Sequence, residues 1–348
     1  MSVFGFHSKL CLTGRHLSGS IKFLSRSLTT SAIRPLHLKR TAQSYRQKMV
    51  CPATVISVTQ ETPCIKRLVL QPADSDFTFR PGQWVDVFIP GVDVVGGFSL
   101  CSSPKQLTSS GTFELAVKAS PHPPARWMSE TAKSGDVIDV RVGGDFFFPP
   151  VCSHGQPTSS SSVSTESDAR GHSAVHNSSQ GDYDILLIGG GVGINPLYSI
   201  LMDVVRHPGL VQDQNSAVGT AAPACEGGLQ ARCDGPRVQA VTLLHSAQKQ
   251  EDVLFRDSLE SMARPNSGEQ KCQVHLCLTR DSVPTDSTGI KHHGGRLSQQ
   301  LLASSVEELR RSNLLCYVCG PPTMIEWTVE QLQQLKLGDE QILYEKWW

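Results

Sequence analysis

A glycine-rich turn is the strongest chemical signal in the sequence. It lies between an apolar run at 185–188 and a segment with helical spacing at 197–205. Glycine lets the main chain turn sharply beside a ligand, and proline favours the first turn of a helix. The free N–H groups of a helix N-terminus attract a pyrophosphate. A glycine cluster can also be only a tight turn, but this context predicts dinucleotide or nucleotide binding at Gly189, Gly190, Gly191, Val192, Gly193, Ile194, Asn195 and Pro196.

The second half of the chain has the pattern that would position such a turn. Continuous apolar runs, typical of parallel strands buried on both faces, lie at 185–188, 238–244, 274–278 and 314–318. Helical spacing lies between and after them, at 197–205, 252–262, 297–310 and 323–335. This alternation predicts an α/β doubly wound parallel-sheet NAD-binding domain over 183–348.

The preceding segment, 49–150, has the pattern of antiparallel strands. Apolar and other residues alternate at 85–89, 113–118 and 138–142. Pro81-Gly82, Ser110-Gly111 and Ser134-Gly135 supply turns between the strands. We therefore expect an N-terminal antiparallel β-barrel or sandwich, with one short helix around Arg126-Trp127-Met128.

With these motifs in this order, the chain resembles the ferredoxin-NADP reductase superfamily of flavoprotein reductases. Residues 79–84 match its barrel signature, 98–104 lie at its flavin motif, and 319–324 match its stretch beside the nicotinamide. The resemblance implies a flavin-binding FR-type barrel and FAD. It assigns the cofactors to Phe98, Ser99, Leu100, Cys101, Cys319, Gly320, Pro321 and the terminal Trp348, which can equally be a core residue. It also implies that Cys319 and Ser102 are the catalytic residues.

Several positions depart from the flavin pattern of that superfamily. Gly96 stands where the superfamily has an arginine that pairs with the flavin phosphate, and Phe98 replaces a tyrosine. His122 and Ala125 stand where a Gly-x-x-Ser helix start is expected, and Arg126 is a candidate substitute charge. A glycine cannot replace a bidentate guanidinium. We therefore expect weak FAD binding, or alternatively a catalytically weakened NAD(H) sensor or scaffold with little or no flavin.

The choice between NAD and NADP depends on cations near the ends of the later strands. A 2′-phosphate needs positive charge, and the sequence offers Lys249 and Arg280 there, without a further basic pair. NAD is therefore favoured. The expected reaction passes a hydride from NADH to flavin and then electrons to an unknown acceptor, for which an iron–sulfur or haem protein is a candidate.

The composition adds expectations about location and partners. Residues 1–60 contain no acid, the first being Glu61, and are rich in Arg, Lys and Ser. This predicts a mitochondrial transit peptide over 1–48 and a location in the mitochondrion, in its matrix. Serine-rich 151–182 and Gly/Ala/Pro-rich 207–237 are predicted disordered insertions.

Other function classes are disfavoured. The chain has 32 basic and 32 acidic residues, which argues against nucleic acid as a partner. No run of about 18 apolar residues suggests a transmembrane segment. The 11 scattered cysteines are read as reduced thiols. No metal site is expected: on a strand, Cys316 and Cys319 point to opposite faces, and His292-His293 are read as a solvated loop.

Overall fold

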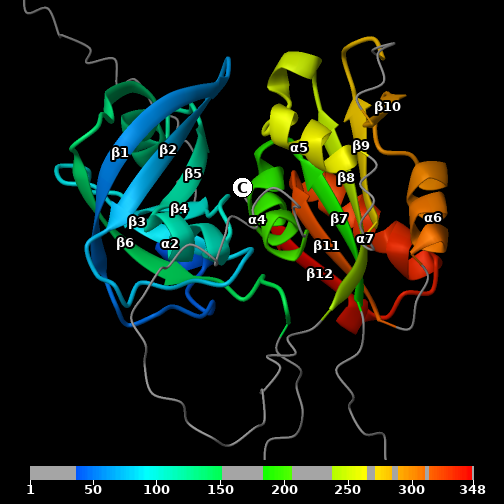
Figure 1. The fold of residues 1–348 in the computed structure, drawn as a ribbon, viewed down its shortest axis with the longest axis horizontal. Helices are drawn as coiled ribbons and strands as arrows, with labels where there is room; N and C mark the ends of the chain where they lie inside the picture. The colour runs from blue at the N-terminus through cyan, green and yellow to red at the C-terminus, as the bar shows by residue number, and fades with distance from the viewer. Residues whose placement is uncertain are drawn as a thin grey trace, which may run out of the picture. The chain divides into compact units, whose positions relative to one another are not determined.

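The structure is a computed structural model, and it describes residues 37–150, 183–205, 237–264, 271–283, 289–309 and 313–346. Figure 1 shows two sheets, one antiparallel and one parallel. The two predicted insertions, except for Arg237, lie outside the described residues, as do Trp348 and most of the predicted transit peptide.

The first sheet closes into a barrel, as the sequence predicted. Its strands are β1 (Cys51–Thr62), β2 (Ile65–Pro72), β3 (Trp84–Phe88), β4 (Gly96–Ser99), β5 (Phe113–Lys118) and β6 (Val137–Gly143), in the order β4-β3-β6-β1-β2-β5. A bridge between Leu100 and Leu115 joins the two edge strands. The barrel is filled by buried side chains such as Leu68, Val85 and Phe113. Closure leaves no unpaired sheet edge at this point.

Short helices complete the barrel lobe. These are α1 (His37–Arg40), α2 (Pro104–Ser110), α3 (Pro123–Arg126) and a π-helical turn, η1 (Trp127–Thr131). The Ser103 side chain caps α2 by accepting a hydrogen bond from the N–H of Gln106, and Gly111 ends it with φ +70°. The predicted helix around Arg126 to Met128 is thus present, whereas α2 was not expected.

The second sheet is parallel and has the order β10-β9-β8-β7-β11-β12. Its strands are β7 (Tyr183–Gly190), β8 (Val238–Ala247), β9 (Lys271–Leu278), β10 (Lys291–Gly294), β11 (Leu314–Gly320) and β12 (Ile342–Lys346). Four of these six strands contain the four predicted apolar runs. The order reverses at β7, which pairs with β8 on one side and with β11 on the other. Ligands of such sheets bind outside the carboxyl ends of the strands at this switch point.

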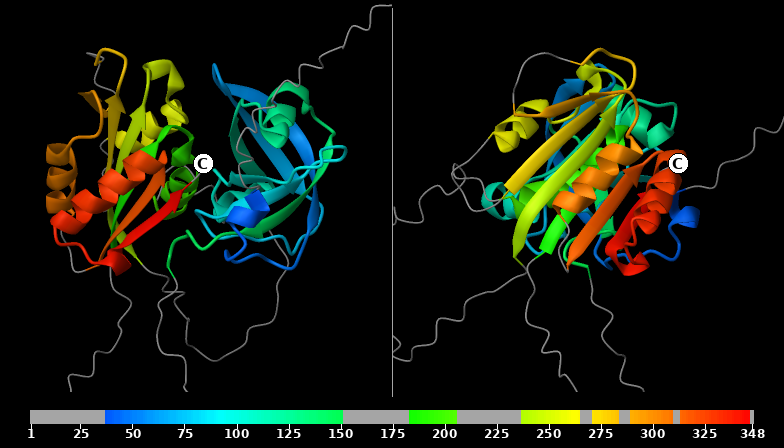
Figure 2. Two further views of the ribbon diagram at one scale, coloured as in Figure 1. Left: turned by 180° about the vertical axis from the view of Figure 1, so that it is seen from behind. Right: turned by 90° about the vertical axis from the view of Figure 1, so that its right-hand side faces the viewer.

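Helices cover both faces of the parallel sheet. These helices are α4 (Ile194–Val204), α5 (Arg256–Ala263), α6 (Gln299–Glu308) and α7 (Pro322–Gln334), with short 3-10 turns η2 (Gly191–Gly193), η3 (Gln250–Asp252) and η4 (Asp339–Gln341). Residues of α4 and α5 pack with Ile185 and Leu187, and residues of α6 and α7 pack with Leu186 and Ile188. Figure 2 shows α6 and α7 across one face. The doubly wound architecture is therefore confirmed.

Three observations refine the expectations from sequence. His292 and His293 form the edge strand β10 and are half-buried, so reading them as a solvated loop was wrong. The His293 ring stacks on His275, with Nδ1 of His275 and Nε2 of His293 3.0 Å apart. The sequence predicted a folded chain that begins near Met49, whereas residues 37–48 already pack on the barrel.

The structure also bears on the membrane and cysteine expectations. In the described segments, no helix is long and apolar enough to span a membrane. The cysteines in these segments are all free thiols. Cys316 packs on the α6–α7 side of the sheet and Cys319 on the α4–α5 side, so the opposite orientation predicted for this pair is confirmed.

Candidate functional site

The glycine-rich turn lies at the switch point of the parallel sheet. β7 ends at Gly190, the turn continues through η2, and α4 begins at Ile194. On the neighbouring β11, Cys319 pairs with Gly189. The fold therefore brings the predicted glycine turn and the predicted Cys-Gly-Pro stretch together at one sheet edge, although they lie far apart in the sequence.

Three glycines allow these two segments to touch. A Cβ atom on Gly193 would lie 2.7 Å from the Cα of Gly320, and one on Gly190 would lie 2.7 Å from the sulfur of Met324. A Cβ on Gly320 would lie 3.1 Å from the N atom of Gly190. Real Cβ atoms do not approach main-chain atoms as closely as the first of these distances, so Gly193 in particular is required by packing.

Gly191 differs from its neighbours in the turn. It has φ +55°, it is exposed, and no atom lies within 4 Å of the position its Cβ would take. The left-handed backbone favours glycine, and the open space above it leaves the main chain accessible. The turn therefore has an exposed main chain at Gly191 and leads, through the buried Gly193, into the N-terminus of an 11-residue helix. This arrangement fits the pyrophosphate of NAD(H).

Cys319, assigned a catalytic role by the resemblance, is fully buried at the end of β11. Burial, and after it the Glu345 carboxylate, raises the pKa of its thiol well above the usual value. A thiol that stays protonated is a poor nucleophile. Its side chain packs in the core of the α4–α5 face, and Gly320 and Pro321 follow it at the same edge.

Helix α4 is bonded directly to the barrel. The Asn195 Nδ2 donates to the main-chain oxygen of Ala116 at 2.7 Å, and Asn195 Oδ1 is buried without a hydrogen-bond partner. The Ser199 hydroxyl donates to the main-chain oxygen of Ser102 at 2.6 Å. The same hydroxyl accepts from the N–H of Gly82 at 3.3 Å. The glycine-turn motif assigned Asn195 to the dinucleotide but gave no sign of this junction, because no local pattern marks contacts so distant in sequence.

The residues at the flavin motif are arranged differently from what tight phosphate binding requires. A Cβ on Gly96 would overlap the Phe98 ring and would lie 2.8 Å from Cβ of Pro124 in α3. α3 begins with Pro123 and Pro124, which have no N–H to donate. Arg126 is exposed. The described residues therefore do not reproduce the phosphate site of the superfamily pattern, because Phe98 and Pro124 fill the space beside Gly96 and the first two residues of α3 donate no N–H.

The remaining residues of the flavin motif are divided between two cores: Phe98 and Leu100 pack in the barrel core, and Cys101 packs with residues of α4. Ser99 ends β4 and is buried, as are Leu100 and Cys101. Burial raises the pKa of the Cys101 thiol. The Ser102 hydroxyl accepts from the N–H of Glu114 at 2.9 Å, so it already has a structural partner. Phe98 is half-buried and supplies an aromatic ring beside the motif.

The carboxyl ends of β8 and β9 combine a few cations with several acids. Lys249 Nζ lies 2.9 Å from Glu251 Oε1. Asp252 accepts from the N–H of Lys249, and Asp281 accepts from the N–H of Gln250. Arg280, the second cation considered for NADP, is exposed. Because Lys249 is already paired and carboxylates surround it, this edge opposes a 2′-phosphate and suits the 2′-hydroxyl of NAD(H).

One buried group beside the turn was missed in the sequence. His245 on β8 pairs with Gly189, is fully buried, and has neither ring nitrogen hydrogen-bonded. Burial lowers its pKa to about 4, so the ring is neutral. The sequence offered only a histidine at the end of an apolar run.

Comparisons with known proteins place this geometry in context. A family model described as "Oxidoreductase NAD-binding domain" matches residues 187–330. A protein of Xenopus tropicalis named "Oxidoreductase NAD-binding domain-containing protein 1" is 36% identical over 325 residues, which are 93% of this chain and 88% of that protein. An "NADH-cytochrome b5 reductase 2" of Aspergillus niger is 28% identical over 140 residues, 40% of this chain and 33% of that protein.

Solved structures share the fold. A crystal structure of a ferredoxin NADP+ reductase from Neisseria gonorrhoeae, described with bound FAD and NADP, gives a TM-score of 0.55 at 17% identity. The match covers 86% of this chain and 99% of that one. The arrangement of barrel and parallel sheet is thus the one found in this group of reductases.

Proposed function

The chain belongs to the oxidoreductase NAD-binding domain-containing protein 1 family, and from that premise we propose that it is an NADH-dependent oxidoreductase whose barrel holds a flavin only weakly. The nicotinamide would enter beside Cys319 and Pro321, and the pyrophosphate would bind at Gly191 to Ile194. The electron acceptor would be a separate protein, such as an iron–sulfur or haem protein.

The observation that carries this proposal is the meeting of two motifs at the switch point. The open main chain at Gly191, the start of α4 and the end of β11 form one edge. α4 is also hydrogen-bonded to the barrel, so this edge and the flavin motif are held in one folded body. Relatives and structural neighbours named as NADH- or NADP-dependent reductases support the same reading.

Each part of the site has a stated task in this proposal. The main chain of the turn binds the dinucleotide, and the acids near Lys249 select the form without a 2′-phosphate. Phe98 and Ser99 would hold the ring end of a flavin. A bound flavin would accept the hydride from NADH and pass electrons on singly. The buried junction around Ser102 and Ser199 excludes water from that region.

A second candidate function is an NAD(H)-binding sensor or scaffold that uses no flavin. It is favoured by one specific observation, the closed space beside Gly96, where Phe98 and Pro124 stand instead of phosphate ligands. The two candidates make different predictions for flavin binding, so one experiment separates them.

The experiment titrates the purified protein with riboflavin, FMN and FAD, following the quenching of flavin fluorescence, and then adds NADH. We expect the three flavins to bind with affinities within about tenfold of one another, because no charge-assisted phosphate contact is available to favour FMN and FAD. NADH should then bleach the bound flavin. FAD binding about a thousandfold tighter than riboflavin would contradict the weak-flavin proposal. If flavin at high micromolar concentration is not quenched, the oxidoreductase proposal fails and the NAD(H)-binding sensor or scaffold remains.

We further propose that the acid-free N-terminal region directs the protein to the mitochondrial matrix. The test is a fluorescent protein fused behind residues 1–48, with a matched fusion in which the arginines and lysines of 1–36 are replaced by glutamine. The first should enter mitochondria and the second should stay outside. Import of the glutamine-substituted fusion would contradict the electrostatic basis of this targeting.

A further inference from the structure

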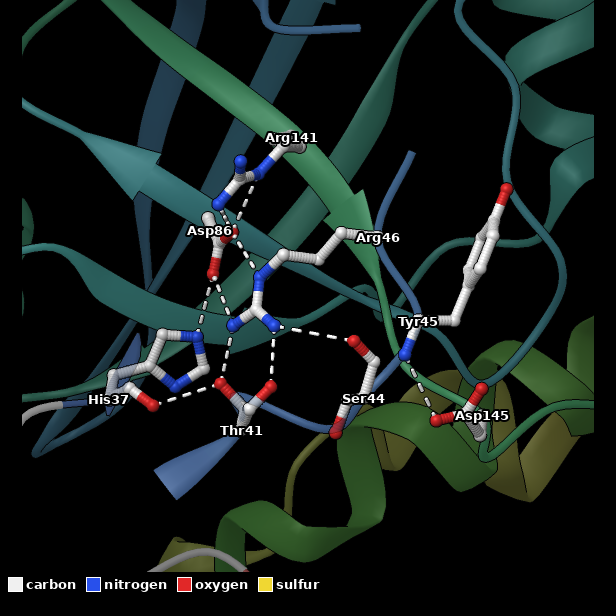
Figure 3. Close-up of polar contacts among 8 residues, drawn as sticks. All are labelled: His37, Thr41, Ser44, Tyr45, Arg46, Asp86, Arg141 and Asp145. Atoms are coloured by element: carbon white, nitrogen blue, oxygen red, sulfur yellow. Dashed lines mark hydrogen bonds and ion pairs between the residues drawn. The ribbon is translucent and has the colours of Figure 1, made fainter. Parts of the chain in front are cut away.

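Asp86 is a buried carboxylate that depends on the segment before the barrel. It lies on β3 and is fully buried. Arg141 of β6 donates to its Oδ2 from Nε at 2.9 Å and from Nη2 at 2.7 Å. The other two partners come from residues 37–48: His37 Nε2 lies 2.8 Å from Oδ1, and Arg46 Nε donates to Oδ2 at 2.9 Å. Figure 3 shows these side chains converging on Asp86.

We name residues 37–48 the strap, because they run across the outer surface of β3, β4 and β6. The main chain of the strap is bonded to the end of β6 and the residues after it. The N–H of Gln47 donates to the oxygen of Val142 at 2.9 Å, and the N–H of Gly144 donates to the oxygen of Tyr45 at 2.9 Å. The N–H of Tyr45 donates to Asp145 Oδ2 at 3.1 Å. These contacts are ladder-like and fix the register of the strap.

The barrel sequence is adapted to the presence of the strap. A Cβ on Gly97 of β4 would overlap the imidazole ring of His37. Trp84 packs edge-on against the same ring, with centroids 5.0 Å apart, and the Arg46 guanidinium lies 4.9 Å from the Trp84 ring centroid. Without the strap, Trp84 would lose its contacts with His37 and Arg46, and Asp86 would keep Arg141 alone of the partners described above.

The pKa of Asp86 also depends on the strap. Burial by itself would raise the pKa of Asp86, but hydrogen bonds from His37, Arg46 and Arg141 outweigh it and hold this pKa below the usual value. Asp86 is therefore a carboxylate in the folded protein. Removing partners from a buried charge is costly, because the charge cannot regain its hydration.

We propose that the strap is retained in the mature protein and that the removable leader ends before His37, rather than at residue 48. Cleavage after residue 48 would discard two of the three side chains that satisfy Asp86. The proposal rests on the mitochondrial targeting proposed above, but not on NADH or flavin binding. It also divides the basic N-terminal region into a leader and a structural part, although both are free of acids.

The first test identifies the mature N-terminus by intact mass and N-terminal sequencing of the protein isolated from mitochondria. The proposal expects a first residue after Met1 and no later than His37. A first residue beyond His37 would overturn it. A chain that still begins at Met1 would overturn both the cleavage and the processed leader on which it rests. Neither result depends on NADH or flavin binding, so this test can fail or succeed independently of the test of the oxidoreductase proposal.

The second test measures urea unfolding of the full chain with Arg46→Met, beside Lys48→Met as a control that removes the same charge from an exposed strap position. Arg46→Met should raise the unfolding equilibrium constant at least about tenfold, and Lys48→Met should change it less than about twofold. Equal effects would overturn the structural role of the strap.

If Arg46→Met does not fold, the strap can still be tested with Gly97→Ala, measured alone and combined with His37→Ala. Gly97→Ala should lower the urea midpoint in the chain that has His37, because the new methyl group meets the imidazole ring. In a His37→Ala background, the same change should lower it much less. A non-additive result supports a docked strap, and strict additivity contradicts it.

Discussion

Gly193 lies against the main chain of Cys319 so closely that a Cβ on the glycine would lie 2.6 Å from the carbonyl carbon of the cysteine. Gly191, two residues earlier, has no atom within 4 Å of its Cβ position. One glycine of the turn is thus needed for packing, and the other leaves the main chain open to a ligand.

The two glycines should therefore respond differently to alanine. Gly193→Ala should destabilise the protein by about 2 kcal/mol or more through overpacking, and it should weaken NADH binding as a consequence. Gly191→Ala should cost only about 1–2 kcal/mol for its left-handed backbone, yet reduce NADH affinity directly. Urea unfolding and calorimetric NADH titration of both variants check this. Unchanged NADH affinity in both would place the dinucleotide elsewhere.

Cofactor preference should depend on the acids at the ends of β8 and β9. Removing a negative charge with Asp281→Asn or Glu251→Gln should raise NADPH affinity about two- to fivefold each, with little change for NADH, because exposed charges interact weakly. Raising the salt concentration should reduce the difference. Glu330→Gln, an exposed position on α7, is the control. Tighter binding of NADPH than NADH by the unaltered protein would contradict the assignment of NAD(H).

Bonds between α4 and the barrel should contribute to stability. Ser199→Ala removes a hydroxyl that serves both Ser102 and Gly82, leaving two buried main-chain groups unpaired. The expected loss is about 1–3 kcal/mol of unfolding free energy. Ser304→Ala on α6 is a control whose hydroxyl bonds only within its own helix. Thermal unfolding followed by circular dichroism measures the stability of both variants. Equal losses of stability would mean that the bonds between α4 and the barrel contribute no more than a hydrogen bond within one helix.

Stability should fall in mild acid because of buried neutral histidines. The folded-state pKa of His245 is lowered to about 4 by burial, below its usual value of about 6.5. The unfolded chain then binds the proton more readily, so stability from this group is complete above about pH 6.5 and is lost as pH falls toward 4. The loss approaches about 3 kcal/mol.

His245→Phe should flatten this part of the pH profile, since the new side chain does not titrate. It should also raise stability at neutral pH by removing two unpaired buried nitrogens. His292→Gln on the edge strand β10 provides the comparison. Unfolding free energies measured from about pH 4 to 8 decide the matter, and an unchanged slope in His245→Phe would assign the acid sensitivity to other groups.

Much of this molecule was predictable because it follows strong periodicities. Alternation at 113–118 and continuous apolar runs such as 314–318 arise from burial on one or both faces of a sheet, and both runs are strands. β4 has the sequence Gly-Gly-Phe-Ser, which has little strand propensity, and only its resemblance to a motif drew attention to it. β10 is short and polar because an edge strand can be half-exposed, and for that reason the sequence was read as a loop.

The site was predictable only in part. The glycine turn and the Cys-Gly-Pro stretch each have a local signature, and the parallel sheet brings both to one edge. The bond from Asn195 to Ala116 and the cluster around Asp86 join residues far apart in the sequence. No spacing rule connects such partners, since they meet only through the tertiary fold. From composition alone, residues 37–48 are predicted to belong to the leader, because a basic residue that contacts a buried carboxylate cannot be told from a targeting residue; the contacts of His37 and Arg46 with Asp86 appear only in the fold.

Both halves of the fold contain buried free thiols, so the rate at which a reagent modifies each thiol reports how fast that half unfolds locally. Cys51 lies in the barrel core and Cys316 in the parallel sheet, and both are inaccessible while their surroundings are closed. A thiol-reactive dye can therefore modify each of these two cysteines only after its sheet has opened. Mass spectrometry of the labelled peptides would then measure the opening of each half separately, in one sample, without any engineered cysteine.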